Sequence, residues 1–111
     1  MSKEIQELAE KAKNRTIDLS DIKGSVFTIT NIGSIGGLHA TPIINPGESA
    51  ILALGKIYEK PVVKNGKIKI RSVLPLSLSF DHRVTDGAEA ARFANKLIEY
   101  LEDPDELLTE L

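Results

Sequence analysis

The chain has 111 residues, of which 41% are hydrophobic and 27% charged, and its net charge is −2. This length and composition are typical of one globular domain with a modest core. The weak negative charge gives no reason to expect binding to nucleic acid or to an anionic membrane surface. The absence of cysteine excludes disulfides, a thiol nucleophile and thiolate metal sites. The two histidines, His39 and His82, are not spaced as a ligand pair, so we predict no metal site.

The N-terminal segment is predicted to be a helix over residues 3–13, with Ser2 as a possible N-cap. Its apolar residues form one narrow stripe that needs a neighbour to pack against: Ile5, Leu8, Ala9 and Ala12. The first residues do not resemble a signal peptide, and the apolar runs are too short to span a bilayer. We therefore expect a cytoplasmic protein with no membrane partner.

The middle of the chain is predicted to be a series of strands. Residues 25–30 are rich in β-branched residues, and the glycines of 33–37 then predict a tight turn. Residues 50–54 are continuously apolar, as in a strand covered on both faces, and we expect this strand to continue past Gly55 towards Val63. Asn65-Gly66 then predicts a type I′ hairpin.

Residues 68–80 show the clearest strand pattern. The even positions are apolar except for Ser72, and the odd positions are mostly polar, among them Ser77 and Ser79. This alternation fixes the register and predicts that the even positions face the core. Pro75 has no N–H group, so the strand is expected to be an edge there, to be bulged, or to be completed by another chain.

A second helix is predicted to begin after Asp86, where Asp86 and Glu89 have the spacing of a capping box. Its core face is expected to contain Ala90, Phe93, Ala94, Leu97, Ile98 and Leu101. Pro104 stops this helix and starts a short final one. The order of elements predicts an α+β fold, a two-layer sandwich with a mixed or antiparallel sheet and helices on one face.

His82 lies between the long strand and the second helix, four residues before Asp86. A histidine so placed, with a carboxylate nearby, can move protons near neutral pH. The spacing alone favours a loop histidine followed by an aspartate that only caps the helix. His39 lies among loop residues and is expected to be solvated.

Four segments resemble, in order, the catalytic domain of the dihydrolipoamide acyltransferases, the core components of 2-oxoacid dehydrogenase complexes: Phe27–Gly37, Ala40–Glu48, Ala50–Gly55 and Leu74–Gly87. These enzymes are similar to chloramphenicol acetyltransferase and share its His-x-x-x-Asp-Gly arrangement. The family's catalytic domain is longer, and the chain, as a single domain over residues 1–111, resembles only its C-terminal part. It contains no sequence resembling a lipoyl or a subunit-binding domain.

The resemblance implies a role for three residues. His82 is the general base that deprotonates the thiol of coenzyme A, or of dihydrolipoamide in the reverse direction, and its own carbonyl orients the ring. Thr30 donates a hydrogen bond to the oxyanion of the tetrahedral intermediate, with Asn31 as the neighbouring alternative. Asp86 organises the site, and in chloramphenicol acetyltransferase-like relatives it pairs with an arginine of the upstream half. Ser77 and Ser79 could line the substrate channel.

By the same resemblance, the chain is expected to be an acyltransferase that moves an acyl group between dihydrolipoamide and coenzyme A. Coenzyme A is then a substrate, the lipoyl group sits on another domain or chain, and no cofactor is bound covalently here. The family builds its site between the subunits of a trimer, so other copies of the chain are expected partners. The alternative is a non-catalytic oligomerising fragment, or a half-domain that needs a separate chain to complete the site. The acyl group cannot be read from these residues.

Overall fold

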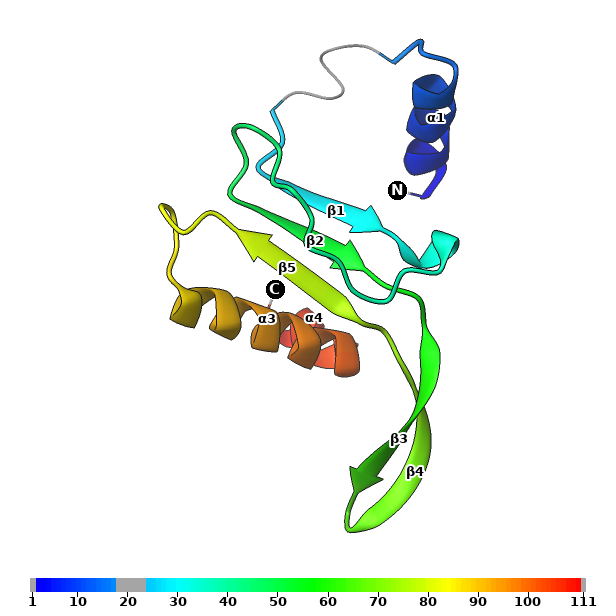
Figure 1. The fold of residues 1–111 in the computed structure, drawn as a ribbon, viewed down its shortest axis with the longest axis vertical. Coiled ribbons are helices and arrows are strands. Elements are labelled where there is room, and N and C mark those ends of the chain that lie inside the picture. The colour runs from blue at the N-terminus through cyan, green and yellow to red at the C-terminus, as the bar shows by residue number, and fades with distance from the viewer. Residues whose placement is uncertain (1, 18–23, 111) are drawn as a thin grey trace.

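The computed structural model describes residues 2–17 and 24–110. Its elements, in chain order (Figure 1), are α1 (Ser2–Lys13), β1 (Phe27–Asn31), the 3-10 helix η1 (Gly33–Ile35), β2 (Ala50–Leu54), β3 (Tyr58–Lys64), β4 (Lys67–Val73), β5 (Leu76–Phe80), α3 (Gly87–Glu102) and α4 (Pro104–Glu110). Among these helices, none combines the length and the apolar character needed to cross a membrane. The predicted α+β class is confirmed.

The main sheet has the strand order β1-β2-β5 and is mixed, because β1 runs parallel and β5 antiparallel to the central strand β2. Phe27 is level with Ala50 and Phe80 at one end of the sheet. The buried residues of β2 are Ile51, Leu52 and Ala53. Their burial confirms the prediction that this strand is covered on both faces.

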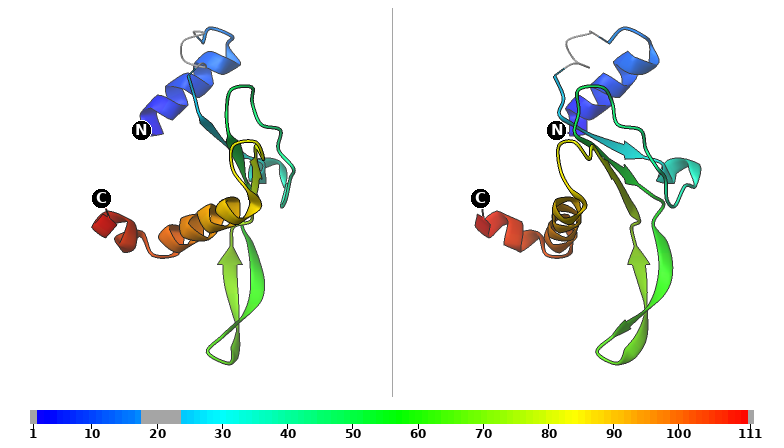
Figure 2. Two further views of the ribbon diagram at one scale, coloured as in Figure 1. Left: turned by 90° about the vertical axis from the view of Figure 1, so that its left-hand side faces the viewer. Right: turned by 60° about the vertical axis from the view of Figure 1, so that its left-hand side comes forward.

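The described α-helices lie on one side of the sheet, as predicted. Figure 2 shows α1, α3 and α4 on the same side, with the irregular segment 36–49 on the other. Phe93 of α3 packs against Phe27 of β1, with ring centroids 5.9 Å apart. The α1 stripe stays exposed, since Ile5 retains 60% of its accessible surface. Helix α1 includes Ser2 as its first residue, so Ser2 is not the N-cap of the sequence prediction.

Two predicted strands are shorter than expected, and this corrects the sequence prediction. Strand β2 ends at Leu54 instead of continuing towards Val63, and the alternating run 68–80 is divided at Leu74-Pro75. The Gly55 N–H donates to the Pro75 carbonyl over 2.8 Å, which closes the sheet at this point. Pro75 has no N–H group with which to donate a second hydrogen bond to the neighbouring strand. The β-sheet hydrogen bonding therefore stops there, and the chain continues as a separate hairpin.

This hairpin, β3–β4, projects away from the sheet (Figure 1). Asn65 and Gly66 have φ of 54° and 77°, as a type I′ turn requires, so this turn is confirmed. The predicted core-facing side is wrong for β4: Ile68 and Ile70 are 78% and 70% exposed. The described part of the chain contains nothing that covers this face.

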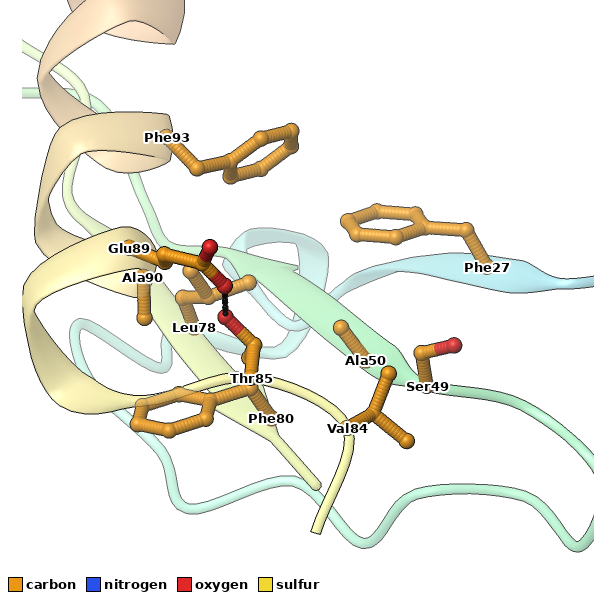
Figure 3. A pocket seen from close by; sticks show the side chains of 10 residues that line it. All are labelled: Phe27, Ser49, Ala50, Leu78, Phe80, Val84, Thr85, Glu89, Ala90 and Phe93. Atoms are coloured by element: carbon orange, nitrogen blue, oxygen red, sulfur yellow. Dashed lines mark hydrogen bonds between the residues drawn. The ribbon is translucent and has the colours of Figure 1, made fainter. Parts of the chain in front are cut away.

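An apolar cavity of about 310 Å³ lies between α3 and the sheet (Figure 3). Phe27 and Phe93, whose rings are in contact, line it together with Leu78 and Phe80 of β5. Of the predicted core face of α3, only Ala90 is fully buried, and Leu101 is 58% exposed. The two layers are therefore in place, but within the described residues the core between them is only partly filled.

Backbone packs directly on backbone where residues 33–38 meet the chain around Gly55. A Cβ atom on Gly55 would lie 2.1 Å from the Leu38 carbonyl oxygen, and one on Gly33 would lie 2.6 Å from the Gly55 carbonyl oxygen. Gly36, with φ of 89°, turns the intervening chain so that this approach is possible. The tight turn predicted for residues 33–37 is thus confirmed.

We expect Gly55→Ala to lower the free energy of unfolding by about 1–3 kcal/mol, because the new methyl group meets rigid backbone atoms. Chemical denaturation of the two proteins measures this change. Gly87→Ala is the matched control, since its Cβ would meet no atom within 4 Å. Equal stabilities of the Gly55 and Gly87 variants would show that the contact between the two segments is not required.

Candidate active site

His82 lies in the turn that joins β5 to α3. Its side chain is exposed, and its ring packs against the ring of Phe80, with centroids 5.7 Å apart and planes inclined by 37°. No other described residue forms a hydrogen bond with the ring, so both nitrogens are available to a ligand. The expected hydrogen bond from a ring N–H to the carbonyl of His82 itself stays a prediction.

Asp81 holds this turn together. Its carboxylate accepts hydrogen bonds from the Arg83 backbone N–H at 2.9 Å and from Nε and Nη2 of the same arginine at 3.0 and 2.8 Å. Its carbonyl accepts from the N–H groups of Val84 and Thr85, and its own N–H donates to the Ser49 carbonyl next to β2. Asp81 therefore attaches the histidine turn to the central strand.

The hydrogen bonds from Arg83 lower the pKa of Asp81 to about 2. The same contact raises the pKa of Arg83 above its ordinary value. Both groups are therefore charged throughout the range from mildly acid to mildly basic pH. The sequence prediction did not identify this pair, although Asp81 and Arg83 flank His82 directly.

His82 lines an open groove of about 490 Å³ between its turn and residues 42–48. Below, we call it the His82 groove. Its walls are Pro42, Ile43, Ile44, Asn45, Pro46, Gly47 and Glu48 on one side and Ser79, Phe80, Asp81, His82 and Arg83 on the other. The volume lies in the range of sites for small molecules, and Ile43 and Ile44 give it an apolar part.

Glu48 anchors the wall of the groove opposite His82. Its carboxylate accepts hydrogen bonds from the Ser25 and Thr28 hydroxyls, and the Asn45 side chain donates to the Thr28 oxygen over 3.0 Å. These contacts, that of Ser25 above all, hold the pKa of Glu48 below its ordinary value. The sequence prediction also missed this network, because it joins segments 17 to 23 residues apart.

Thr30 lies on β1, level with Ala53 and Ser77. Strand geometry separates its Cα atom from that of Phe80 by roughly 14 Å, since three residues along and two strands across lie between them. The chain beyond Phe80 continues away from Thr30, because Asp81 pairs with Ser49. The structure therefore does not bring Thr30 and His82 together within one chain.

Asn31 occupies the opposite end of the sheet from His82. Its side-chain oxygen accepts the Gly33 N–H over 2.9 Å and so starts the turn into η1. It borders a second open groove of about 490 Å³, the Asn31 groove, lined by Asn31, Gly33, Ser34, Leu54, Gly55, Lys56, Ile57 and Leu74. The chain thus presents one groove with the histidine and another bordered by Asn31, one of the two candidate oxyanion donors.

Asp86 is the N-cap of α3, as predicted. Its carboxylate accepts the Glu89 N–H over 2.8 Å, and Glu89 in turn accepts a hydrogen bond from the Thr85 hydroxyl. In the described structure, Asp86 forms no hydrogen bond or ion pair with His82. Within one chain, Asp86 therefore fixes where the helix begins.

We expect Asp86→Ala to lower the free energy of unfolding by about 0.5–2 kcal/mol, because the Glu89 N–H loses its acceptor. Asp86→Asn should retain most of the stability, since an amide oxygen can also cap the helix. Thermal unfolding of the three proteins tests this order. Equal loss in both variants would mean that the charge of Asp86, and not its cap, is what matters.

The other polar residues named from the sequence have simpler surroundings. The Ser77 hydroxyl accepts the Ala40 N–H over 3.3 Å and so attaches the irregular segment to the sheet, whereas Ser79 borders the His82 groove. His39 is exposed, as expected. Among the described residues, no group of three or more acidic, histidine or cysteine side chains is placed to hold a metal ion.

The two-layer α+β fold, with a histidine turn between a strand and a capped helix, agrees with the chloramphenicol acetyltransferase-like fold class predicted from the sequence. The chain belongs to the 2-oxoacid dehydrogenase acyltransferase family, whose catalytic-domain model matches residues 1–109.

Three relatives illustrate the similarity. The dihydrolipoyllysine-residue succinyltransferase component of the 2-oxoglutarate dehydrogenase complex of Haemophilus influenzae is 46% identical over 111 residues. The acetyltransferase component of the Staphylococcus aureus pyruvate dehydrogenase complex is 48% identical over 110. A crystal structure of Azotobacter vinelandii dihydrolipoamide acetyltransferase, solved to study a serine, a histidine and an asparagine in its catalytic mechanism, has a TM-score of 0.91 at 46% identity.

The match covers only part of each relative. It includes 100% and 99% of this chain but 27% and 26% of the two curated proteins. For the solved structure it includes 95% of this chain and 43% of the other. The chain therefore spans about a quarter of the curated relatives and less than half of the solved catalytic chain.

Proposed function

We propose that this chain carries the histidine half of an acyltransferase site that moves an acyl group between dihydrolipoamide and coenzyme A. The observation that carries the proposal is the exposed His82 ring, held on a fixed turn at the edge of an open groove. A thiol with a pKa of about 8.5 is mostly protonated at neutral pH, so attack on a thioester needs a base. His82 is the side chain of the groove suited to that task.

The proposed reaction needs no group besides the two substrates and the protein. His82 takes the proton of the attacking thiol while the sulfur of that thiol forms a bond to the thioester carbonyl carbon. The Thr30 hydroxyl donates a hydrogen bond to the oxyanion formed on the carbonyl oxygen. When the tetrahedral intermediate breaks down, the bond to the leaving sulfur is cleaved and His82 returns the proton to it.

The spacing of three residues supports these roles. In the Azotobacter vinelandii enzyme, the serine stands 52 residues before the histidine and the asparagine four residues after it. Thr30 and Asp86 have the same spacings from His82 in this chain. The match favours Thr30 over Asn31 as the oxyanion donor, and the asparagine at the third position fits an organising Asp86 better than a proton-accepting one.

We further infer that the complete site lies between two copies of the chain. Thr30 and His82 are at different ends of one sheet, so the hydroxyl that serves His82 must come from a neighbour. Large exposed apolar side chains fit such contacts, among them Ile35 at 86% and Ile43 at 87%. Three such contacts related by a rotation axis close a trimer.

Accordingly, we expect the chain to form a trimer or a larger oligomer at micromolar concentration. Sedimentation velocity measures its mass directly. A stable monomer of 12.1 kDa would contradict the assembly.

Mixing two inactive variants tests the shared site itself. A His82→Ala copy retains Thr30, and a Thr30→Ala copy retains His82, so in a reassembled equimolar mixture about one quarter of the interfaces combine both intact residues. We expect thioester exchange to return to that fraction of the wild-type rate. No recovery after reassembly, in a preparation whose unmixed wild type is active, would place the whole site within one copy.

Either acyl group fits the present similarities, because a succinyltransferase and an acetyltransferase match almost equally well. The exchange assay should therefore include both acetyl-CoA and succinyl-CoA with dihydrolipoamide. The proposal places the lipoyl group on another domain or chain, treats coenzyme A as a substrate, and places the protein in the cytoplasm.

A second candidate function is a half-domain that acts only after another polypeptide completes it. The apolar cavity between α3 and the sheet favours this alternative, since complete domains fill such space. The same residues would then do the same chemistry, but only in the completed assembly.

A further inference from the structure

We propose that Asp81 is the positioning residue of the His82 base and that Arg83 holds the Asp81 carboxylate in place for this task. The assignment rests on the function proposed above. It concerns the direction in which the imidazole points, and not the proton transfer itself.

Three polar groups of Asp81 fix the turn around His82. The carboxylate and the Arg83 N–H close an Asx turn with His82 as its central residue. The carbonyl accepts from Val84 and Thr85 on the far side of the histidine, and the N–H is paired with Ser49. The Cα–Cβ bond of His82 therefore has one direction relative to the central strand for as long as Asp81 keeps these partners.

The side chain of His82 is restrained from a second direction by Phe80, whose ring lies 5.7 Å away. A base must reach the proton it abstracts within hydrogen-bond distance, so an exposed imidazole needs such restraints to remain in place. The turn and the aromatic contact together supply such restraints.

The exposures of the two charged residues argue against a simple surface ion pair. Arg83 is 90% exposed but the Asp81 side chain only 18%. An isolated exposed pair contributes little to stability. Here, however, the arginine donates two side-chain hydrogen bonds and one backbone hydrogen bond to one carboxylate, which fixes the position of that carboxylate within the turn.

A graded set of variants separates the contribution of the Asx turn from that of the ion pair between Asp81 and Arg83. Asp81→Asn retains an oxygen for the Arg83 N–H, whereas Asp81→Ala loses both the turn and the ion pair. We expect Asp81→Ala to lower kcat by on the order of 10- to 100-fold with little change in KM, and Asp81→Asn to lower it less. Arg83→Gln should resemble Asp81→Asn, and Arg92→Gln on α3 is its control, with unchanged kcat.

NMR of the two histidines provides a readout that does not need activity. The ring protons of His82 should be displaced from those of the exposed His39 by the ring current of Phe80. In Asp81→Ala, we expect the His82 signals to move to positions like those of His39 while the amide spectrum of the sheet stays unchanged. The variant His39→Gln assigns the two sets of signals.

The outcomes are separable. If His82→Ala leaves thioester exchange intact, the proposed function fails. If His82→Ala abolishes exchange but Asp81→Ala leaves both kcat and the His82 signals unchanged, only the positioning role is overturned. Should Asp81→Ala not fold, Asp81→Asn and Arg83→Gln carry the same comparison, and unaltered kcat and spectra in both would overturn the proposal.

Discussion

Replacing His82 by alanine should lower kcat for thioester exchange by about 10²–10⁴-fold, the usual contribution of general acid–base catalysis. No other titratable side chain of the His82 groove is available for the proton. Asp81 and Glu48 are held charged at low pKa by hydrogen bonds, and Arg83 remains protonated. Steady-state rates with coenzyme A and dihydrolipoamide, in the assembled protein, measure the loss.

The fold should tolerate this change. His82 is exposed and its ring makes no hydrogen bond to another described residue, so its removal costs only the contact with Phe80. We expect the melting temperature of His82→Ala to stay near that of the wild type. His39→Ala, the only other histidine variant the chain allows, is the control and should retain full activity. Turnover near the wild-type level in His82→Ala would remove the base from the mechanism.

Local sequence patterns were sufficient to predict the helices, strands and turns around the candidate site. The apolar run 50–54 predicted a central strand, Asn65-Gly66 a hairpin turn, and Asp86 with Glu89 the start of α3, and each is confirmed. For the hairpin turn and the start of α3, residues close in sequence make the decisive contact. The His82 motif belongs to the same category, because its strand and its helix flank it directly.

The departures from prediction come from contacts between distant segments. Alternation over 68–80 indicated one strand, but the bond between Gly55 and Pro75 ends the sheet in the middle of it. No local pattern identifies such a pair. The Glu48 network and the distance between Thr30 and His82 likewise depend on how the strands are ordered.

Burial could be predicted least well, for a physical reason. The even face of 68–80 and the face of α3 have the apolar residues of a core, yet Ile68 is 78% and Phe93 48% exposed within the described structure. A hydrophobic pattern indicates that a face will be covered, but not which polypeptide covers it. The proposed association of copies depends on faces with this same pattern.

The isolated chain should therefore show thioester exchange far below that of an intact catalytic domain. Coenzyme A needs a channel for its pantetheine arm and donors for its phosphates, and the His82 groove is open along its length. Well-positioned reactants gain on the order of 7–11 kcal/mol over free encounter. The open groove of the isolated chain cannot hold both thiols in line with the histidine, so we expect a loss of kcat/KM of at least about 100-fold.

Calorimetric titration with coenzyme A, combined with the exchange assay, measures both parts of this expectation. Adding the upstream half of a relative's catalytic domain as a separate polypeptide should fill the cavity next to Phe27 and Phe93 and raise the exchange rate. The His82→Ala chain, mixed with the same half, controls for activity brought in by the partner. Tight, saturable binding and rapid exchange by the 111-residue chain alone would show that this half of the domain is sufficient.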